Sequence, residues 1–68
     1  MSNFSTNLKH YREASGFTQK ALSDMLGITT RAYQRYESGE REPKIDMLIS
    51  IADIFHITLD VLVGRKFP

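Results

Sequence analysis

The sequence contains no cysteine and only two prolines and four glycines in 68 residues. Without cysteine, neither a disulfide framework nor a thiolate metal site can stabilise the chain. A domain of this length is close to the lower limit at which one hydrophobic core suffices for stability. We therefore expect stability to come from side-chain packing, supplemented by self-association.

Long hydrophobic runs and targeting segments are also missing. The longest apolar stretch, IDMLISIADIFHITLDVLVG, is interrupted by three Asp and one His, so it is unsuited to crossing a bilayer. No basic segment followed by an apolar run marks a signal peptide. Apolar residues still make up 41% of the chain, which is typical of a globular domain. With no repeat or linker in evidence, residues 1–68 are expected to form a single cytoplasmic domain.

Neither sign of charge is in excess, because nine Lys and Arg oppose eight Asp and Glu. A net charge of +1 indicates no particular partner. Basic and acidic residues are interleaved, however, between positions 31 and 44. The basic ones are Arg31, Arg35, Arg41 and Lys44, and the acidic ones are Glu37, Glu40 and Glu42. Any site for a polyanion would need some of these acids turned away from it.

Apolar periodicity predicts five short helices with tight connections, and hence an all-α fold. Thr18 and Thr29 each stand where a hydroxyl can cap the free N–H groups of a first turn. Thr58 starts the last helix, with Asp60 in its first turn suiting the positive end of the helix dipole. Gly27 and Gly64 stand where a left-handed residue ends a helix. The expected helices cover residues 3–15, 18–26, 29–38, 44–55 and 58–63.

The third expected helix, 29–38, divides into two faces at about 100° per residue. Its apolar side consists of Ala32, Tyr33 and Tyr36. Its other side is polar and carries no acid, and it consists of Thr30, Arg31, Gln34, Arg35 and Ser38. We expect the apolar side to pack on the preceding helix, whose inner face is predicted to be Ala21, Leu22, Met25 and Leu26. The polar side would then face outward.

The fourth expected helix, 44–55, is apolar over most of its circumference. One stripe consists of Ile45, Leu48, Ile49, Ala52 and Phe55, and a second of Met47, Ile51 and Ile54. Such a helix is either central to the core or shared with a partner.

Two helices joined by a tight glycine turn, the second with an uncharged or basic outer face, form the helix-turn-helix pattern. Tyr11–Leu62, YREASGFTQKALSDMLGITTRAYQRYESGEREPKIDMLISIADIFHITLDVL, resembles the phage-repressor and Cro-like helix-turn-helix family, which includes the Xre-type regulators. The motif positions are Arg12, Ala14, Gly16, Thr18, Gln19, Leu26, Gly27, Glu37, Gly39, Pro43, Ile51 and Ala52. Two positions depart from the pattern, since Lys44 replaces a frequent capping Ser and His56 a frequent Gly.

The resemblance implies a compact, lambda-repressor-like domain of five helices, with the helix-turn-helix formed by the second and third. It further implies a sequence-specific regulator of transcription that binds double-stranded DNA, a dimeric repressor of phage, prophage or bacterial type. Such a protein associates with the nucleoid when bound. It is not an enzyme, and no catalytic constellation or phosphate-cradling glycine loop is visible. His10 and His56 lack a second ligand at metal-binding spacing, so no metal or cofactor is implied.

A helix in the major groove reaches base edges with outward side chains near its N-terminus. The positions that match the family's base-reading ones are Thr30, Arg31 and Arg35, and Gln34 points the same way. Arg offers two donors to guanine, Gln can pair with adenine, and a Thr methyl can touch thymine.

Other residues are expected to contact the DNA backbone or to brace the domain. Gln19 matches the family's phosphate-clamping Gln, and Thr18 is first a cap and secondarily a phosphate contact. Ser38, Arg41 and Lys44 could hold neighbouring phosphates, although free solvation of Arg41 is an equal alternative. In the family, the residues matching Arg12 and Glu37 form a partly buried ion pair, so Glu37 is expected to turn away from DNA.

Helix-turn-helix proteins usually bind two half-sites about 34 Å apart as two-fold dimers. We expect a homodimer on a two-fold symmetric operator. The candidate dimer surface consists of Met47, Ile54, Val61 and Phe67. Its alternative is an extension of the monomer core.

Three other hypotheses for the function of the protein remain open. An antitoxin or a restriction-modification controller would share the same DNA-binding module. A helical protein-interaction module that has lost DNA binding would favour acids or large apolar residues on the polar side of 29–38, and they are absent. The short chain is expected to have no separate ligand-sensing domain and no small-molecule ligand.

Overall fold

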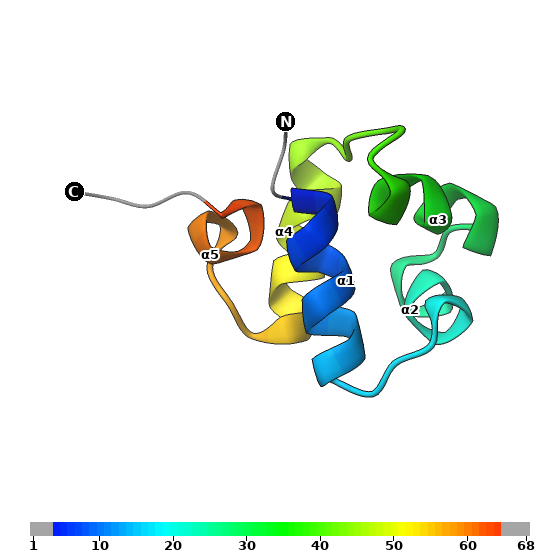
Figure 1. Cartoon of the computed structure of the whole chain (residues 1–68), viewed down its shortest axis with the longest axis horizontal. Coiled ribbons are helices and arrows are strands. Elements are labelled where there is room, and N and C mark those ends of the chain that lie inside the picture. The colour runs from blue at the N-terminus through cyan, green and yellow to red at the C-terminus, as the bar shows by residue number, and fades with distance from the viewer. Residues whose placement is uncertain (1–3, 65–68) are drawn as a thin grey trace.

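The computed structural model describes residues 4–64, which form five α-helices around one hydrophobic core (Figure 1). The helices are α1 (Phe4–Ala14), α2 (Gln19–Leu26), α3 (Thr30–Ser38), α4 (Ile45–Phe55) and α5 (Leu59–Val63). α1 and α4 occupy the middle of the molecule, with α2 and α3 at one end and α5 at the other (Figure 1). The expected all-α, five-helix architecture is confirmed.

Threonine caps begin three of the helices, as the sequence predicted. The hydroxyl of Thr18 accepts a hydrogen bond from the Ala21 N–H at 3.0 Å. Thr29 and Thr58 accept equivalent bonds at 3.1 Å from the third residue of α3 and of α5. Each cap satisfies an N–H that has no partner within its helix and contributes about 1 kcal/mol. The start of α3 is therefore set by Thr29.

Both ends of α4 are less favourable. Lys44 holds the N-cap position without making a side-chain capping bond. At the other end, His56 adopts a left-handed conformation with φ of 56°, which glycine tolerates better than histidine. These are the two positions at which the sequence departs from the family pattern.

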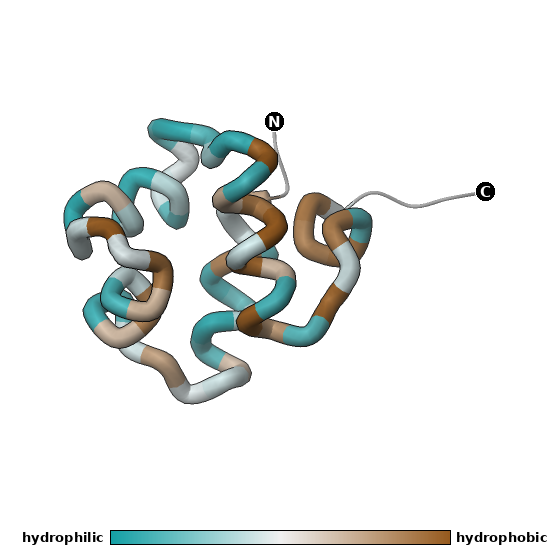
Figure 2. The backbone as a smooth tube through the Cα atoms, turned by 180° about the vertical axis from the view of Figure 1, so that it is seen from behind, coloured by the Kyte–Doolittle hydropathy of each residue, from teal (hydrophilic) through white to brown (hydrophobic). Residues whose placement is uncertain are grey.

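The core gathers residues from all five helices. Its buried apolar side chains are Phe4, Leu8, Leu22, Tyr33, Ile51, Ala52 and Leu62. Figure 2 shows hydrophobic residues along α4 and α5 and mostly hydrophilic ones along α3. Tyr33 is fully buried, so the expected inward face of α3 is correct.

Met25, which was predicted to lie on the inner face of its helix, is exposed, and so are two residues of the first apolar stripe of 44–55. Met25 is 53% exposed, Ile45 57% and Ile49 43%. On α2 the buried direction lies toward Leu22 and Ser23, which places Met25 on the far margin. On α4 it lies between Ile51 and Ala52, so Ile49 is at the edge and Ile45 is in the open first turn.

The candidate dimer surface changes accordingly. Met47 and Ile54 are partly buried and pack against the core, so they offer a partner less surface than the sequence suggested. Val61 is 45% exposed and stays available. Phe67 lies outside the described residues. Within residues 4–64, no helix is long and apolar enough to span a membrane.

Candidate nucleic-acid interface

A three-residue turn, Gly27–Thr29, sets the angle between α2 and α3. Gly27 adopts φ of 71°, a left-handed conformation that needs glycine. Its N–H donates to the Asp24 carbonyl at 3.1 Å, and the Ile28 N–H donates to the Ser23 carbonyl at 3.0 Å. Ile28 also packs against the core. The turn is thus fixed by both backbone bonds and packing.

A buried hydroxyl pair joins the two helices beside this turn. Ser23 is fully buried, and its Oγ donates to the Lys20 carbonyl at 2.8 Å. That bond uses the only hydrogen of the Ser23 hydroxyl, so Thr30 Oγ1, at 3.1 Å, must be the donor to Ser23. Thr30, predicted to read bases, is therefore partly buried with its hydroxyl proton engaged. In the sequence, the only indication of this pair is that the small polar Ser23 lies beside the apolar stripe of α2.

The other predicted base-reading residues share the open face of α3. Arg31, Gln34 and Arg35 are exposed. Together with Ser38 and Glu40 they line a shallow hollow of about 230 Å³. The helix itself contributes no acid to this face, as predicted, but the loop after α3 adds the Glu40 carboxylate. The result is a mainly basic, hydrogen-bonding surface with one acid on its rim.

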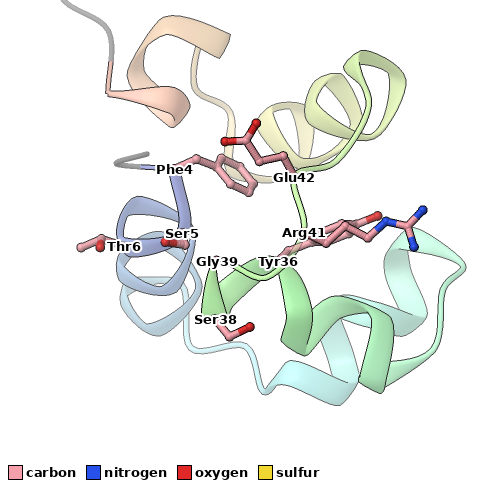
Figure 3. Close-up of a pocket in the computed structure, with 8 residues that line it drawn as sticks. All are labelled: Phe4, Ser5, Thr6, Tyr36, Ser38, Gly39, Arg41 and Glu42. Carbon is pink, nitrogen blue, oxygen red and sulfur yellow. The ribbon is translucent and has the colours of Figure 1, made fainter. Parts of the chain in front are cut away.

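The residues predicted to contact phosphates are spread around α3. Ser38 Oγ donates to the Arg35 carbonyl at 3.1 Å, so it also closes the last turn of the helix. Arg41 and Lys44 are exposed in the loop between α3 and α4. A pocket of about 280 Å³ lies beside this loop. Among its lining residues, the guanidinium of Arg41 is directed away from Ser5 (Figure 3). Arg41 is thus free to reach outward.

An ion pair links α1 to the end of α3. Arg12 Nε lies 2.5 Å from Glu37 Oε2, and Arg12 Nη2 lies 3.2 Å from Oε1. The third guanidinium nitrogen donates to the Phe17 carbonyl at 3.0 Å. Only 12% of the Arg12 side chain and 6% of the Glu37 side chain are exposed. The acid of α3 is therefore held inside the molecule, on the side away from Arg31 and Arg35.

Further donors converge on the same carboxylate. The Tyr33 hydroxyl donates to Glu37 Oε2, and Gln19 Nε2 donates to Oε1 at 3.1 Å. Burial raises the pKa of Glu37, but the hydrogen bonds from Arg12, Tyr33 and Gln19 outweigh it and lower that pKa below its ordinary value. The hydrogen bond to Glu37 also raises the pKa of Arg12. Burial and the same acid raise the pKa of Tyr33, so it acts as a neutral donor.

Gln19 connects this buried cluster to the open face of α3. Besides donating to Glu37, its Oε1 accepts a hydrogen bond from Gln34 Nε2 at 3.1 Å. The residue predicted to clamp a phosphate is thus partly buried between Glu37 and Gln34, with one N–H left unused. The sequence did not predict this link, because it depends on the angle between α2 and α3. Within residues 4–64, no cluster of His, Asp or Glu is arranged to hold a metal ion.

Two helices at a glycine turn, the second with its basic face outward, define a helix-turn-helix domain. The family model described as helix-turn-helix matches residues 8–62. The chain belongs to this family, in its Xre or Cro/C1 type, as the resemblance predicted.

Relatives of the chain include several proteins named as regulators of transcription. It is 47% identical over 60 residues to the uncharacterised regulator YqaE of Bacillus subtilis. The aligned residues cover 88% of this chain and 52% of that protein. It is 41% identical to the cryptic phage CTXphi transcriptional repressor RstR of Vibrio cholerae, over 85% of this chain and 52% of that one.

Solved structures give the same picture of the fold. A transcriptional regulator from Listeria innocua is similar with a TM-score of 0.91 and 32% identity, over all of this chain and 64% of that one. The chain spans about half the length of the curated relatives it matches.

Proposed function

We propose that this chain binds double-stranded DNA sequence-specifically through α3 and represses transcription by occupying an operator. The observation that carries the proposal is the separation of charge on α3. Arg31, Gln34 and Arg35 share an exposed face, while Glu37 is buried against Arg12. A helix sorted in this way presents donors to a polyanion without presenting its own acid.

Each predicted base-reading residue suits a particular base edge in the major groove. Arg31 and Arg35 can each offer two parallel donors to O6 and N7 of guanine. Gln34 can pair with adenine, and the methyl group of Thr30 can touch a thymine methyl. Phosphate contacts are assigned to Gln19, Ser38, Arg41 and Lys44, with Thr18 mainly a cap. These residues flank the base-reading face on both sides.

One relative supports repression as the biological role. The similar protein RstR is named as a phage transcriptional repressor. A domain that covers an operator blocks transcription by occupancy alone, so no catalytic group or cofactor is required. A phage, prophage or bacterial operator is the proposed target.

We further propose that the protein acts as a homodimer on a two-fold symmetric operator. One α3 helix contacts few base pairs, so a second copy would add much of the affinity and specificity. Exposed apolar side chains on the helices away from the exposed face of α3 support this proposal. They are Val61 on α5 and Ile45 and Ile49 on α4. They extend the predicted surface of Met47 and Ile54, which are partly buried.

Selection of bound duplexes from a random pool, followed by fluorescence anisotropy at several salt concentrations, tests the proposal. The selected duplex should bind on the order of 10³-fold more tightly than a random one. Binding of both should fall linearly on a plot of log affinity against log salt, because phosphate contacts release counterions. Absence of binding even at low salt would contradict the proposal and favour a protein-interaction module.

A further inference from the structure

We propose that Gln19 is a positioning residue that fixes the orientation of the Gln34 amide and thereby its choice of base. The inference rests on the proposed function, since it concerns how α3 reads DNA. It follows from a chain of three side chains that runs from Glu37 inside the molecule through Gln19 to Gln34 on the exposed face.

The chain has a direction because its inner end can only accept hydrogen bonds. The ionised carboxylate of Glu37 has no hydrogen to donate. Gln19 must therefore turn its NH₂ group toward Glu37, and the distance from Nε2 to Oε1 is 3.1 Å. The opposite orientation would place the Gln19 carbonyl oxygen against a carboxylate oxygen, where the two would repel.

The orientation of Gln19 then determines that of Gln34. With its NH₂ group turned inward, Gln19 presents its carbonyl oxygen to Gln34. Because that oxygen can only accept a hydrogen bond, Gln34 must donate one from its own NH₂ group. The observed distance from Gln34 Nε2 to Gln19 Oε1 is 3.1 Å. One of the two N–H donors of Gln34 is consumed by this bond.

What Gln34 has left matches adenine better than guanine. Its remaining groups are one N–H donor and the carbonyl oxygen, which complement N7 and the N6 amino group of adenine. Guanine presents two acceptors, N7 and O6, and would need both N–H donors of a freely rotating glutamine. By occupying one of them, Gln19 removes the arrangement that favours guanine. Prior ordering of an exposed side chain also reduces the entropy lost on binding.

Gln19→Met tests the inference, because Met keeps the length of the side chain but cannot form the two hydrogen bonds. Affinities are measured for the selected duplex and for variants with single base-pair changes, using the parent, Gln19→Met, Gln34→Ala and the double variant. The readout is the ratio of affinities for the adenine and guanine versions of one base pair, which cancels any uniform loss of a phosphate contact.

The parent should prefer adenine at one base pair by about fivefold or more, and Gln34→Ala should abolish that preference. Gln19→Met should also abolish most of it, although Gln34 is still present, and the double variant should show no further change. Melting of Gln19→Met checks that the fold persists, which is expected because Arg12 and Tyr33 still bind Glu37.

Other results would overturn the inference. If Gln19→Met keeps the parent's ratio while binding all duplexes more weakly, Gln19 is a phosphate contact only. If Gln34→Ala changes no base preference, Gln34 reads no base, although the proposed function can still stand. If the parent binds no duplex selectively, the proposed function itself fails.

A measurement on the DNA-free protein gives a second test and does not need a variant to fold. Hydrogen exchange of the Gln34 side-chain amide, followed by ¹⁵N NMR, should be slower than that of an exposed amide without a partner, such as a free glutamine. Exchange as fast as that of free glutamine would show that the bond to Gln19 is not maintained in solution, and the inference would be wrong.

Discussion

Among the single residues, Glu37 has an environment that affects both the stability of the domain and the proposed binding of DNA. It lies in the same short helix as Arg31 and Arg35, yet 94% of its side chain is removed from solvent and bound by Arg12, Gln19 and Tyr33. An exposed carboxylate at the end of α3 would repel the phosphates of DNA. The ion pair therefore has two effects, since it fastens α1 to α3 and keeps an acid off the proposed reading surface.

The ionisation of Glu37 should make stability depend on pH in the acid range. Its pKa is raised by burial but lowered overall, by its hydrogen bonds, below the ordinary value of 4.5, so the unfolded chain takes up this proton first. The stabilisation is complete above about pH 5 and is lost as the pH falls through the folded-state pKa. Thermal melting between pH 7 and pH 3 should show a steeper loss for the parent than for Glu37→Gln.

Glu13→Gln is the matched control, because it removes an exposed acid from α1. At pH 7, the free energy of unfolding of Glu37→Gln should be about 3 kcal/mol lower than that of the parent, because Arg12 loses its buried partner. If the melting temperatures of the parent and of Glu37→Gln fall in parallel below about pH 5, protonation of the Glu37 carboxylate is not the cause of the acid-dependent loss of stability.

At the residue scale, the sequence predicted what repeats across a family and missed what depends on local geometry. The Arg12–Glu37 pair was predicted from motif positions alone. The Ser23–Thr30 and Gln19–Gln34 bonds were not, because both cross from α2 to α3 and depend on the angle that Gly27 sets. Polar residues at the interface of two helices cannot be paired without that angle.

At the scale of elements, the cap residues of α4 are less favourable than those of α2, α3 and α5. Its N-cap residue, Lys44, makes no capping bond, and its C-cap residue, His56, holds a left-handed conformation. Three other helices begin at a threonine that does cap. α4 is nevertheless central, since Ile51 and Ala52 are buried in the core. Its unfavourable ends should therefore be measurable in the stability of the whole domain.

Lys44→Ser should stabilise the protein while weakening its binding to DNA. A serine hydroxyl can cap the first turn of α4, which is worth about 0.5–2 kcal/mol, and the change removes a cation from the positive end of the helix dipole. The same change deletes a proposed phosphate contact. Melting should rise, and the slope of log affinity against log salt should become shallower by about one unit. An unchanged slope would show that Lys44 does not contact phosphate.

His56→Gly should stabilise the fold without affecting DNA binding. Glycine adopts the left-handed conformation without the steric conflict of a side chain, but it also increases the entropy of the unfolded chain. The net increase in the free energy of unfolding should be about 0.5–1 kcal/mol. Denaturant unfolding measures the change, with His10→Gly in the interior of α1 as a destabilising counterpart. A loss of stability in His56→Gly would mean that the imidazole makes contacts that outweigh the strain.

At the scale of the whole molecule, helix number and order followed from periodicity and capping residues, whereas the facing of individual side chains did not. Tyr33 was correctly placed in the core. Met25 was predicted to face inward and is exposed, and Ile45 and Ile49 of the apolar stripe on α4 are also exposed, because such a stripe is wider than the surface that a neighbouring helix can cover. Of these exposed residues, Ile45 and Ile49 on α4 are the candidates for contact between two copies, together with Val61 on α5.

Val61→Glu should weaken the proposed homodimer. Val61 is 45% exposed on α5, and a carboxylate there would have to be desolvated in an apolar interface. Sedimentation equilibrium of the parent should show concentration-dependent dimers that Val61→Glu reduces. Met25→Glu, at an apolar position on α2 that is 53% exposed, serves as the control. A parent that stays monomeric at high concentration and on DNA would rule out the dimer.

The central claim is that the exposed face of α3 reads bases, and Arg31→Ala on a set of single base-pair variants of the selected duplex tests it most directly. Arg31 is exposed, so the variant should melt like the parent. Anisotropy should show a loss of about 1–3 kcal/mol on the selected duplex and a loss of preference at one G·C pair, with the other positions unaffected. Equal weakening on every duplex would contradict the claim and make Arg31 a phosphate contact.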